Sequence, residues 1–471
     1  MAVKGILVKT QLKLHLSNIF FFLLNILHIL VAATSKISVK TEGFLRFSII
    51  PFQQFNVSAF VIAIVIFVIQ LLISYIILLR KFKTSGLTQI NELGIIGENN
   101  EKILTNLRID PKQIFTWVHE LAEEQNIKSI KRIYLTDTSI PNAMTMDVVP
   151  IPGIRSTWIV LDANVLEILD EREIKAVISH ELGHVKYFDA IVNLYRFGIN
   201  FFVYIAYSLI VLTLLYRISE VIIEGTSTPL GIALKIAFFI VVILILWALT
   251  IINRLLMNFS RRQAEFMADY YAAKKVGRNH IINALVILGQ RLDVVTSFAT
   301  EVKWLGSLEG KNDMTREFVQ GIKDLPSKEL SKEISREKAV KTYIYQRLKN
   351  LRDDLFIPIT DEQIDEFTKI ASEKLLKKRG DLIQNGTAPD RKLQEEMVKL
   401  TIDWLLIDKD KDLYLNEEEI EQLVTKLILN PNKELFEQDI VHRRSIFGTD
   451  HPSMRDRIIF LYYASKNLKR T

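Results

Sequence analysis

The chain has 471 residues, of which 49% are hydrophobic and 24% charged, and it contains no cysteine. Its mean hydropathy of +0.19 is high for a uniform water-soluble domain with this many charges, so the composition indicates a membrane part joined to a soluble part. The lack of cysteine excludes disulfide scaffolds, thiolate zinc sites and cysteine catalysis. A net charge of +6 suits either nucleic acid or an anionic membrane surface, and the positions of the basic residues decide between them.

Four apolar runs are candidate membrane spans, at residues 19–33, 57–79, 197–216 and 236–252. The second is the clearest, because 23 helical residues extend about 34 Å and the bilayer core is about 30 Å thick. The first is short and contains Asn25 and His28, so its alternative is a signal peptide cleaved near Ala33.

Basic residues follow the second and fourth runs directly: Arg80, Lys81, Lys83, Arg254, Arg261 and Arg262. Cytoplasmic flanks carry an excess of Lys and Arg, so this pattern places residues 81–196 and 253–471 on the cytoplasmic side. The loop at 35–56 carries three basic residues of its own, which weakens the asymmetry. The positive balance is then a property of the membrane flanks, and the sequence shows no nucleic-acid-binding motif.

The soluble segments predict mixed structure before residue 170 and helices after residue 300. Strands are expected at 129–135, 141–149 and 157–161, and helices at 111–126, 328–353, 361–379, 391–407 and 417–429, with a loop at 380–390. Asp170 and Glu173 have the spacing of a capping box, which predicts that a further helix starts there.

That helix carries the sequence His180-Glu181-Leu182-Gly183-His184. Residues four apart lie on one helix face, so both imidazoles can reach a single metal ion. Glu181 is placed beside the first of them, where a carboxylate can take a proton from water activated by zinc. The alternative is a solvent-facing helix with incidental histidines.

Two histidines leave a zinc ion short of a protein ligand, and Glu265 is the next candidate. It lies on a helix that continues from the fourth apolar run, and Asp269 follows it one turn later on the same face. Asp269 could accept a hydrogen bond from the second ring nitrogen of a ligating histidine. Alone, such a carboxylate pair is common on solvated helices; beside the HExxH sequence it indicates a zinc site.

These stretches resemble the HtpX-type membrane metalloproteases, which are gluzincins related to the CAAX prenyl proteases. The similarity covers about residues 95–275 and 440–465, and rests on HELGH at 180–184, RRQAEFMAD at 261–269, Pro141-Asn142-Ala143, and His451-Pro452 with Arg457. It implies one zinc ion per chain, held by His180, His184 and Glu265, with Glu181 as the catalytic base.

The resemblance also implies roles on the substrate side of the cleft. Asn142 and Ala143 would bind substrate at an edge strand, and His451 and Arg457 would be catalytic, in oxyanion stabilisation or substrate positioning. Arg457 could instead pair with a buried carboxylate such as Asp269. Two departures from the family pattern concern this side: Asp450 is inserted before His451, and Met144-Thr145 follows Ala143.

The predicted fold is a mainly α membrane protein with four transmembrane helices, a cytoplasmic α+β gluzincin-like metalloprotease domain and a helical insert. The expected parts are a transmembrane hairpin at 1–83, catalytic parts at 84–190 and 258–300, a second transmembrane hairpin at 191–257, a charged EF-hand-like insert at 301–440, and a C-terminal catalytic element at 441–471.

The spacing between the motifs and the spans predicts where the site lies. The third run begins 13 residues after His184 (197 − 184), and Glu265 comes 13 residues after Ile252 (265 − 252). If both connections are helical, the zinc ion lies about 20 Å from each membrane entry.

The expected function is therefore that of a multi-pass cell-membrane endopeptidase. It would cleave membrane or misfolded proteins at the cytoplasmic surface of the bilayer, in protein quality control. The alternatives are a CAAX-type prenyl protease and a non-catalytic membrane scaffold.

A second candidate metal site lies in the insert, where oxygen-bearing residues have the spacing of an EF-hand calcium loop. The candidate ligands are Asp408, Asp410, Asp412, the carbonyl of Tyr414, and Glu419. Leu413 stands where such a loop needs glycine for its sharp turn. The alternative is an acidic helix–loop–helix that binds no cation.

Overall fold

The computed structural model describes residues 2–34, 36–40, 46–50, 54–83, 87–96, 109–136, 141–149, 155–187, 189, 229–308, 360–384, 400–436, 439–440 and 451–465, with a few isolated residues between 341 and 349. The apolar run at 197–216 and most of the predicted helix at 328–353 lie outside these residues. The described part is a helix-rich fold built around a small sheet, which confirms the mixed character expected of the soluble domain.

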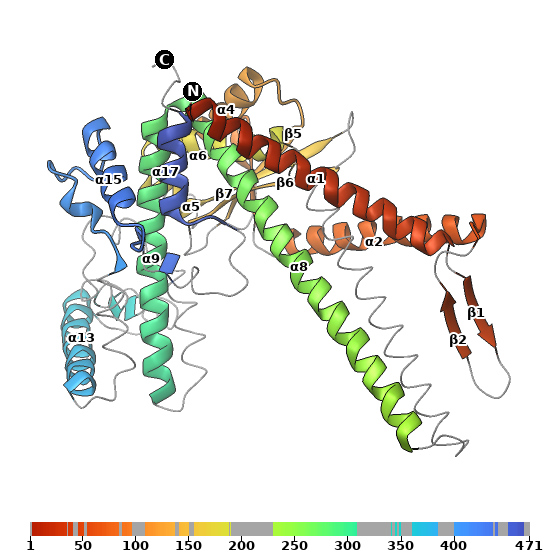
Figure 1. The fold of residues 1–471 in the computed structure, drawn as a ribbon. Helices are drawn as coiled ribbons and strands as arrows, with labels where there is room; N and C mark the ends of the chain where they lie inside the picture. The colour runs from red at the N-terminus through yellow and green to blue at the C-terminus, as the bar shows by residue number, and fades with distance from the viewer. Residues whose placement is uncertain are drawn as a thin grey trace.

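The sheet has five strands in the order β4-β3-β5-β7-β6. Their bounds are β3 Thr88–Asn91, β4 Gly94–Ile96, β5 Ile130–Thr136, β6 Ala143–Val149 and β7 Ser156–Asp162. Strands β5 and β7 pair in parallel, whereas β6 pairs antiparallel with β7 and ends the sheet. The three strands predicted from sequence are confirmed as β5, β6 and β7, and β6 is an edge strand of the sheet (Figure 1).

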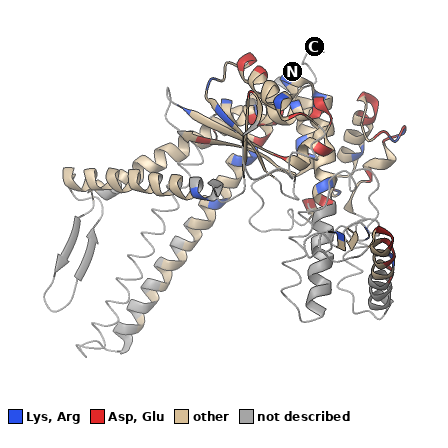
Figure 2. Cartoon of the chain, turned by 180° about the vertical axis from the view of Figure 1, so that it is seen from behind, with Lys and Arg blue, Asp and Glu red and all other residues tan. Residues whose placement is uncertain are grey.

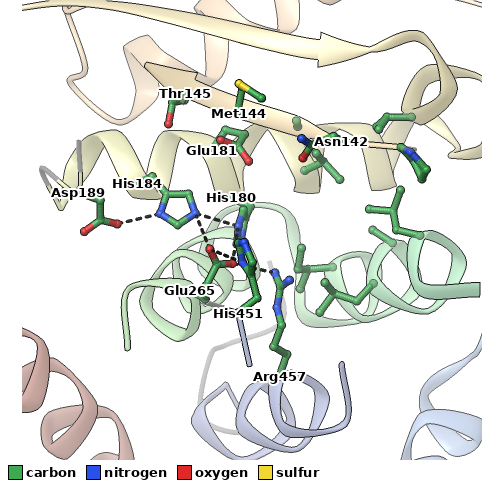
Figure 3. Close-up of a pocket in the computed structure, with 18 of the residues that line it drawn as sticks. Asn142, Met144, Thr145, His180, Glu181, His184, Asp189, Glu265, His451 and Arg457 are labelled. Atoms are coloured by element: carbon green, nitrogen blue, oxygen red, sulfur yellow. Dashed lines mark hydrogen bonds and ion pairs between the residues drawn. The ribbon is translucent and has the colours of Figure 1, made fainter. Parts of the chain in front are cut away.

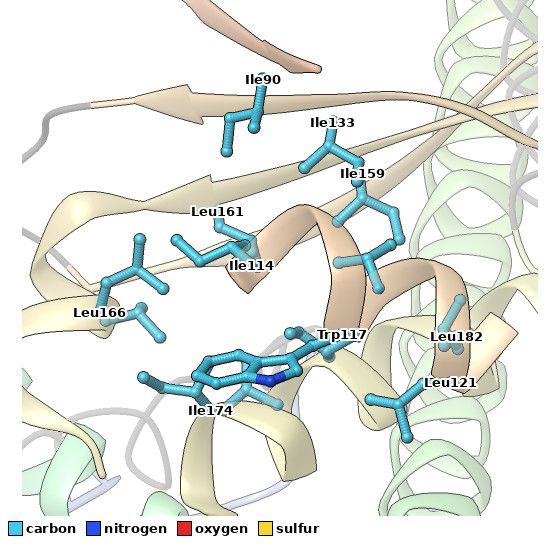
Figure 4. Close-up of a cluster of buried hydrophobic side chains, with 14 of the residues drawn as sticks. Ile90, Ile114, Trp117, Leu121, Ile133, Ile159, Leu161, Leu166, Ile174 and Leu182 are labelled. Atoms are coloured by element: carbon cyan, nitrogen blue, oxygen red, sulfur yellow. The ribbon is translucent and has the colours of Figure 1, made fainter. Parts of the chain in front are cut away.

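Two helices cover one face of this sheet and form the main core with it. α4 (Pro111–Glu124) begins as predicted: the Asp110 side chain accepts a hydrogen bond from the Lys112 amide, and proline occupies the first turn. Its buried face is Ile114, Trp117, Val118 and Leu121, at the spacing of an amphipathic helix. These side chains pack with α6 (Glu171–Lys186) against strand residues such as Ile133 and Ile159 (Figure 4).

The helices that contain the apolar runs extend away from the sheet (Figure 1). α1 (Ala2–Thr34) contains the first apolar run, α2 (Val57–Lys83) the second, and α8 (Pro229–Val276) the fourth. Between α1 and α2 the chain forms the antiparallel pair β1 (Lys36–Lys40) and β2 (Arg46–Ile50). Within the described residues, one segment meets the length and composition needed to cross a membrane, Val57–Ile77 in α2.

A second core joins α9 (Arg278–Leu308) to the C-terminal half of the chain. α15 (Glu417–Leu429) and α17 (Met454–Ala464) pack on α9 through buried side chains that include Ile282, Leu423 and Ile458. α15 has the bounds predicted from sequence. α13 (Asp361–Gln384) runs five residues beyond the predicted helix, into the segment expected to be a loop.

The predicted helix at 391–407 is wrong at its C-terminal end. Thr401 forms a parallel bridge with Glu434, and the Ile402 amide donates to the Glu434 carbonyl at 2.9 Å. The backbone groups at residues 401 and 402 therefore pair with Glu434, and they are not available for the hydrogen bonds of a helix. Only a 3-10 turn, η1 (Trp404–Leu406), follows, capped by the Asp403 side chain.

Candidate metal centre

The helix that carries the HExxH sequence starts at the predicted capping box. The Glu173 carboxylate accepts a hydrogen bond from the Asp170 amide at 2.9 Å, which fixes the first turn of α6. Burial, together with the Asp170 charge, raises the pKa of Glu173 to about 7, although the hydrogen bond from the Asp170 amide acts to lower it. Two turns later, His180 and Glu181 are buried, and His184 is half-buried at the wall of the cleft.

Gly183 allows α6 to approach α8 closely. A Cβ atom on Gly183 would lie 2.9 Å from the Cα atom of Ala268, a contact with backbone that no rotamer change can relieve. Ala268 stands between Glu265 and Asp269 on α8. The glycine of the HELGH sequence thus sets the distance between the two helices that carry the candidate ligands.

Three side chains converge at this helix contact (Figure 3). Nε2 of His180 and Nε2 of His184 are 3.1 Å apart, and the Glu265 carboxylate oxygens lie 3.5 Å from the first and 3.7 Å from the second. Donors at about 2.0–2.1 Å from a tetrahedral zinc ion would be roughly 3.3 Å from one another. The donor set and its spacing therefore fit a zinc ion.

A carboxylate contacts the Nδ1 atom of each imidazole, on the side of the ring away from the metal centre. Nδ1 of His180 lies 2.9 Å from Oδ1 of Asp269, and Nδ1 of His184 lies 2.8 Å from Oδ2 of Asp189. Such contacts fix the ring tautomer and leave Nε2 free to ligate. Asp269 was expected in this place. Asp189 was missed, although an acidic residue five positions after the second histidine was a signal that could have found it.

Arg457 of α17 lines the cleft and pairs with Asp269. Its Nε and Nη2 atoms lie 2.7 and 2.6 Å from the two Asp269 oxygens, and Nη2 is 3.7 Å from Oε2 of Glu265. The sequence suggested a pair with a buried carboxylate such as Asp269 as an alternative role for Arg457, and the structure shows this pair. This bidentate pair ties the C-terminal element to the helix that carries the third candidate ligand.

The electrostatics of the cluster favour a cation. Burial acts to lower the pKa of His184, but Asp189, Glu265 and Glu181 outweigh it and raise that pKa to about 10. Burial likewise acts to raise the pKa of Glu265, but His180 and His451 outweigh it, and that pKa is held well below the usual range. The ionised carboxylates around two imidazoles thus form a site suited to a divalent ion.

The candidate ligands line a cleft of about 690 Å³ between α6 and the edge strand β6. Asn142, Ala143, Met144 and Thr145 form the strand side of this cleft, and Glu181 faces them (Figure 3). His451 lies at the mouth with its side chain 69% exposed and Nδ1 3.0 Å from Oε1 of Glu265. Of the residues predicted for the peptidase site, the three candidate ligands, Glu181 and the substrate-side residues line this cleft, and Asp269 contacts His180. Asp450, which precedes His451, lies outside the described residues.

Arg155 connects the edge strand to the metal-binding helix. Its Nε donates to Oδ2 of Asp147 on β6 at 2.7 Å, and its Nη1 donates to the Val185 carbonyl at 2.6 Å. Thr157 donates to the other Asp147 oxygen. Sequence reasoning did not find this cluster, because its members come from three separate elements.

Two histidines one turn apart on one helix, joined by a glutamate from a second helix, are the arrangement of gluzincin-type metallopeptidases. Comparison with known proteins agrees with that class: residues 110–314 match the model of peptidase family M48. The protein named Protease HtpX homolog of Burkholderia thailandensis is 35% identical over 81 residues. Its counterparts in Burkholderia mallei and Burkholderia pseudomallei are 33% identical over the same length.

These matches cover 17% of this chain and 27% of the length of each relative. They confirm the predicted resemblance to HtpX-type metalloproteases over the part of the chain that is matched. The similarity to peptidase family M48 extends over residues 110–314, less than half of the chain.

Substituting Gly183 with alanine should disturb the metal centre. We expect Gly183→Ala to cost about 1–3 kcal/mol, because the new methyl group meets the backbone of α8. The two helices would then separate, and zinc affinity would fall. Thermal unfolding and zinc content in detergent measure both effects.

Gly5→Ala on α1 is the matched control, since a Cβ atom there meets nothing within 4 Å. Equal behaviour of the two variants would contradict the close-approach role of Gly183.

Proposed function

We propose that this protein is a zinc-dependent endopeptidase embedded in the cell membrane. It hydrolyses peptide bonds of membrane or misfolded proteins near the cytoplasmic membrane surface, in protein quality control. The observation that carries the proposal is the convergence of His180, His184 and Glu265 beside Glu181, within a cleft bounded by an edge strand.

The edge strand provides the substrate-binding surface. Because β6 ends the described sheet, its outer backbone groups face the cleft and can pair with an extended segment of substrate. Asn142 and Ala143 begin this surface. An added strand would run along Met144 and Thr145 and bring a peptide carbonyl over the metal centre.

The chain's own residues supply the proton transfers. His180, His184 and Glu265 would hold one zinc ion, which supplies Lewis acidity and makes water more acidic. Glu181 accepts the proton of the attacking water and delivers it to the leaving amine nitrogen. His451, at the cleft mouth, can donate to the substrate carbonyl oxygen, and Arg457 positions Asp269 and Glu265.

The long helices support a membrane location. α2 has mean hydropathy 3.0 over its candidate span and leaves apolar side chains such as Val61, Leu72 and Ile77 exposed. Figure 2 shows charged residues gathered on the sheet with its covering helices and on the C-terminal helices, whereas residues 57–79 of α2 and 236–252 of α8 contain none. Four spans, with the catalytic domain on the cytoplasmic side, account for this separation.

α8 supports a site close to the membrane. It is one continuous helix from the fourth apolar run to Glu265, so Ile252 and Glu265 are about 20 Å apart along its axis. A cleft about 20 Å from the end of the membrane span would be within reach of polypeptides that emerge from the bilayer. The connection from α6 to the third apolar run lies outside the described residues.

Removal of the metal tests the proposal. The protein purified in detergent is expected to contain one zinc ion per chain and to cleave itself or an added membrane protein. A chelator should abolish cleavage, and added zinc should restore it, because the two imidazoles and the carboxylate have no other means of activating water. Cleavage that persists after zinc is removed would refute the zinc-peptidase assignment. Selective cleavage of prenylated peptides would favour the CAAX-type alternative.

A further inference from the structure

The acidic loop at residues 408–419 adopts the backbone shape of a calcium loop despite lacking the expected glycine. Leu413, at the sixth position, has φ +65°, and Lys411, at the fourth, has φ +58°. Residues other than glycine rarely adopt this left-handed conformation. Leu413 is held there because its amide donates to Oδ2 of Asp408 at 3.0 Å and its side chain packs on the second core. The absent glycine therefore does not prevent the turn.

Three carboxylates face one another inside this loop. Oxygen atoms of Asp408, Asp410 and Asp412 lie within 4.8 Å of one another. Asp408 is only 3% exposed, and its Oδ1 atom is buried and accepts no hydrogen bond from the described residues. A bound cation would satisfy this buried carboxylate oxygen, which has no hydrogen-bond donor within the described part of the chain and lies beside two further carboxylates.

Glu419, at the twelfth position, covers the same loop. It is 2% exposed, its Oε1 accepts the Lys409 amide at 2.9 Å, and its Oε2 accepts the Asn416 amide at 3.0 Å. The carboxylate is thus buried against the loop backbone, where it joins Lys409 near the start of the loop to Asn416 near its end. In calcium loops this position supplies a bidentate glutamate.

The loop is fixed to the catalytic body through α9. The Asn283 side chain donates to the Leu415 carbonyl at 2.9 Å and accepts from the Leu415 amide at 2.7 Å. The hydroxyl of Tyr414 lies 3.2 Å from Nδ1 of His280. The Asn283 side chain thereby hydrogen-bonds to both the amide and the carbonyl of Leu415, as the backbone of a neighbouring strand would. α9 also lines the cleft, through Ile281 and Leu285.

We propose that residues 408–419 bind one Ca²⁺ ion, through the carboxylates of Asp408, Asp410, Asp412 and Glu419 and the carbonyl oxygen of Tyr414. These groups offer up to six oxygen atoms, and Ca²⁺ accepts six to eight in flexible geometry, whereas Mg²⁺ demands a near-ideal octahedron. The bound ion stiffens the contact between the insert and α9. This site is separate from the zinc centre and does not depend on the peptidase proposal.

Calcium titration of the full-length, zinc-loaded chain in detergent tests the site. The Glu181→Gln chain serves as parent so that self-cleavage does not interfere, and calorimetry is combined with thermal unfolding. We expect one ion per chain and a higher unfolding temperature with calcium. Glu419→Gln should weaken binding by about 10-fold or more, because it removes a ligand charge but keeps an acceptor for the backbone amides. Asp410→Asn, at an exposed position, should also weaken binding and is the second variant if Glu419→Gln does not fold.

Glu418→Gln is the matched control, since it removes the same charge from the same helical turn at an exposed position. It should change calcium binding less than about 2-fold, because its exposed carboxylate is not among the proposed ligands. The proposal is overturned if the folded parent shows neither heat nor a shift in unfolding temperature at millimolar calcium. It is equally overturned if magnesium binds as tightly as calcium, or if Glu418→Gln weakens binding as much as Glu419→Gln.

Discussion

The Glu181→Gln variant is expected to bind zinc like the parent chain and to lose cleavage of a membrane-protein substrate by about 10²–10⁴-fold. Glu181 is buried next to His180, with its carboxylate within 4.8 Å of both imidazoles, while Glu265 provides the third ligand of the proposed zinc site. The amide of glutamine has nearly the same shape as the carboxylate and cannot take up a proton from water. Zinc content and the rate of substrate cleavage, measured on the same preparation, separate the two properties.

Glu171→Gln is the matched control for this variant. Glu171 lies in the first turn of the same helix and is exposed, with its carboxylate 2.6 Å from Nζ of Lys175. Its loss should leave both zinc content and cleavage unchanged, since an exposed pair of this kind contributes little. Full activity of Glu181→Gln would show that the HExxH helix does not perform the proton transfer, and the peptidase proposal would fail.

The candidate site could be predicted from the sequence where its signals are local. The HExxH spacing lies on one helix, and the capping box at Asp170 marks where that helix begins, so two ligands and the base follow from about fifteen consecutive residues. The same holds for α4, whose cap and apolar face are both continuous in sequence. The strands β5, β6 and β7 were found for the same reason.

Contacts between segments that are distant in the sequence could not be predicted from such local patterns. Asp147, Arg155 and Val185 come together only because β6 packs beside the end of α6. The helix predicted at 391–407 fails where Thr401 pairs with Glu434, a partner 33 positions away (434 − 401). Tertiary pairing here overrides local propensity.

Leu413 shows a different limit of sequence patterns. The glycine rule for calcium loops counted against a cation site, because a leucine at that position has an unfavourable backbone conformation. In the structure the side chain packs on the second core, which offsets that conformational cost. A motif position can therefore be filled by a residue whose compensating contact lies elsewhere in the fold.

The pair formed by Arg457 and Asp269 gives the second large expected effect. Asp269 is 0% exposed and accepts two hydrogen bonds from Arg457, which holds the pKa of its carboxyl below the usual range against the opposing effect of burial. Arg457→Met would leave that charge buried without its partner and should destabilise the protein by about 3–5 kcal/mol. Denaturant unfolding of the full chain in detergent measures this loss.

The double variant Asp269→Asn with Arg457→Met distinguishes pairing from packing. Removal of both charges should recover much of the stability lost in Arg457→Met, since the uncompensated carboxylate is gone. Zinc affinity should nevertheless stay reduced by about 10–100-fold, because the group that orients His180 has changed. If the single and double variants were equally unstable, the loss would come from packing of the Arg457 side chain. If both variants bound zinc normally, Asp269 would not be the residue that positions the ligating histidine.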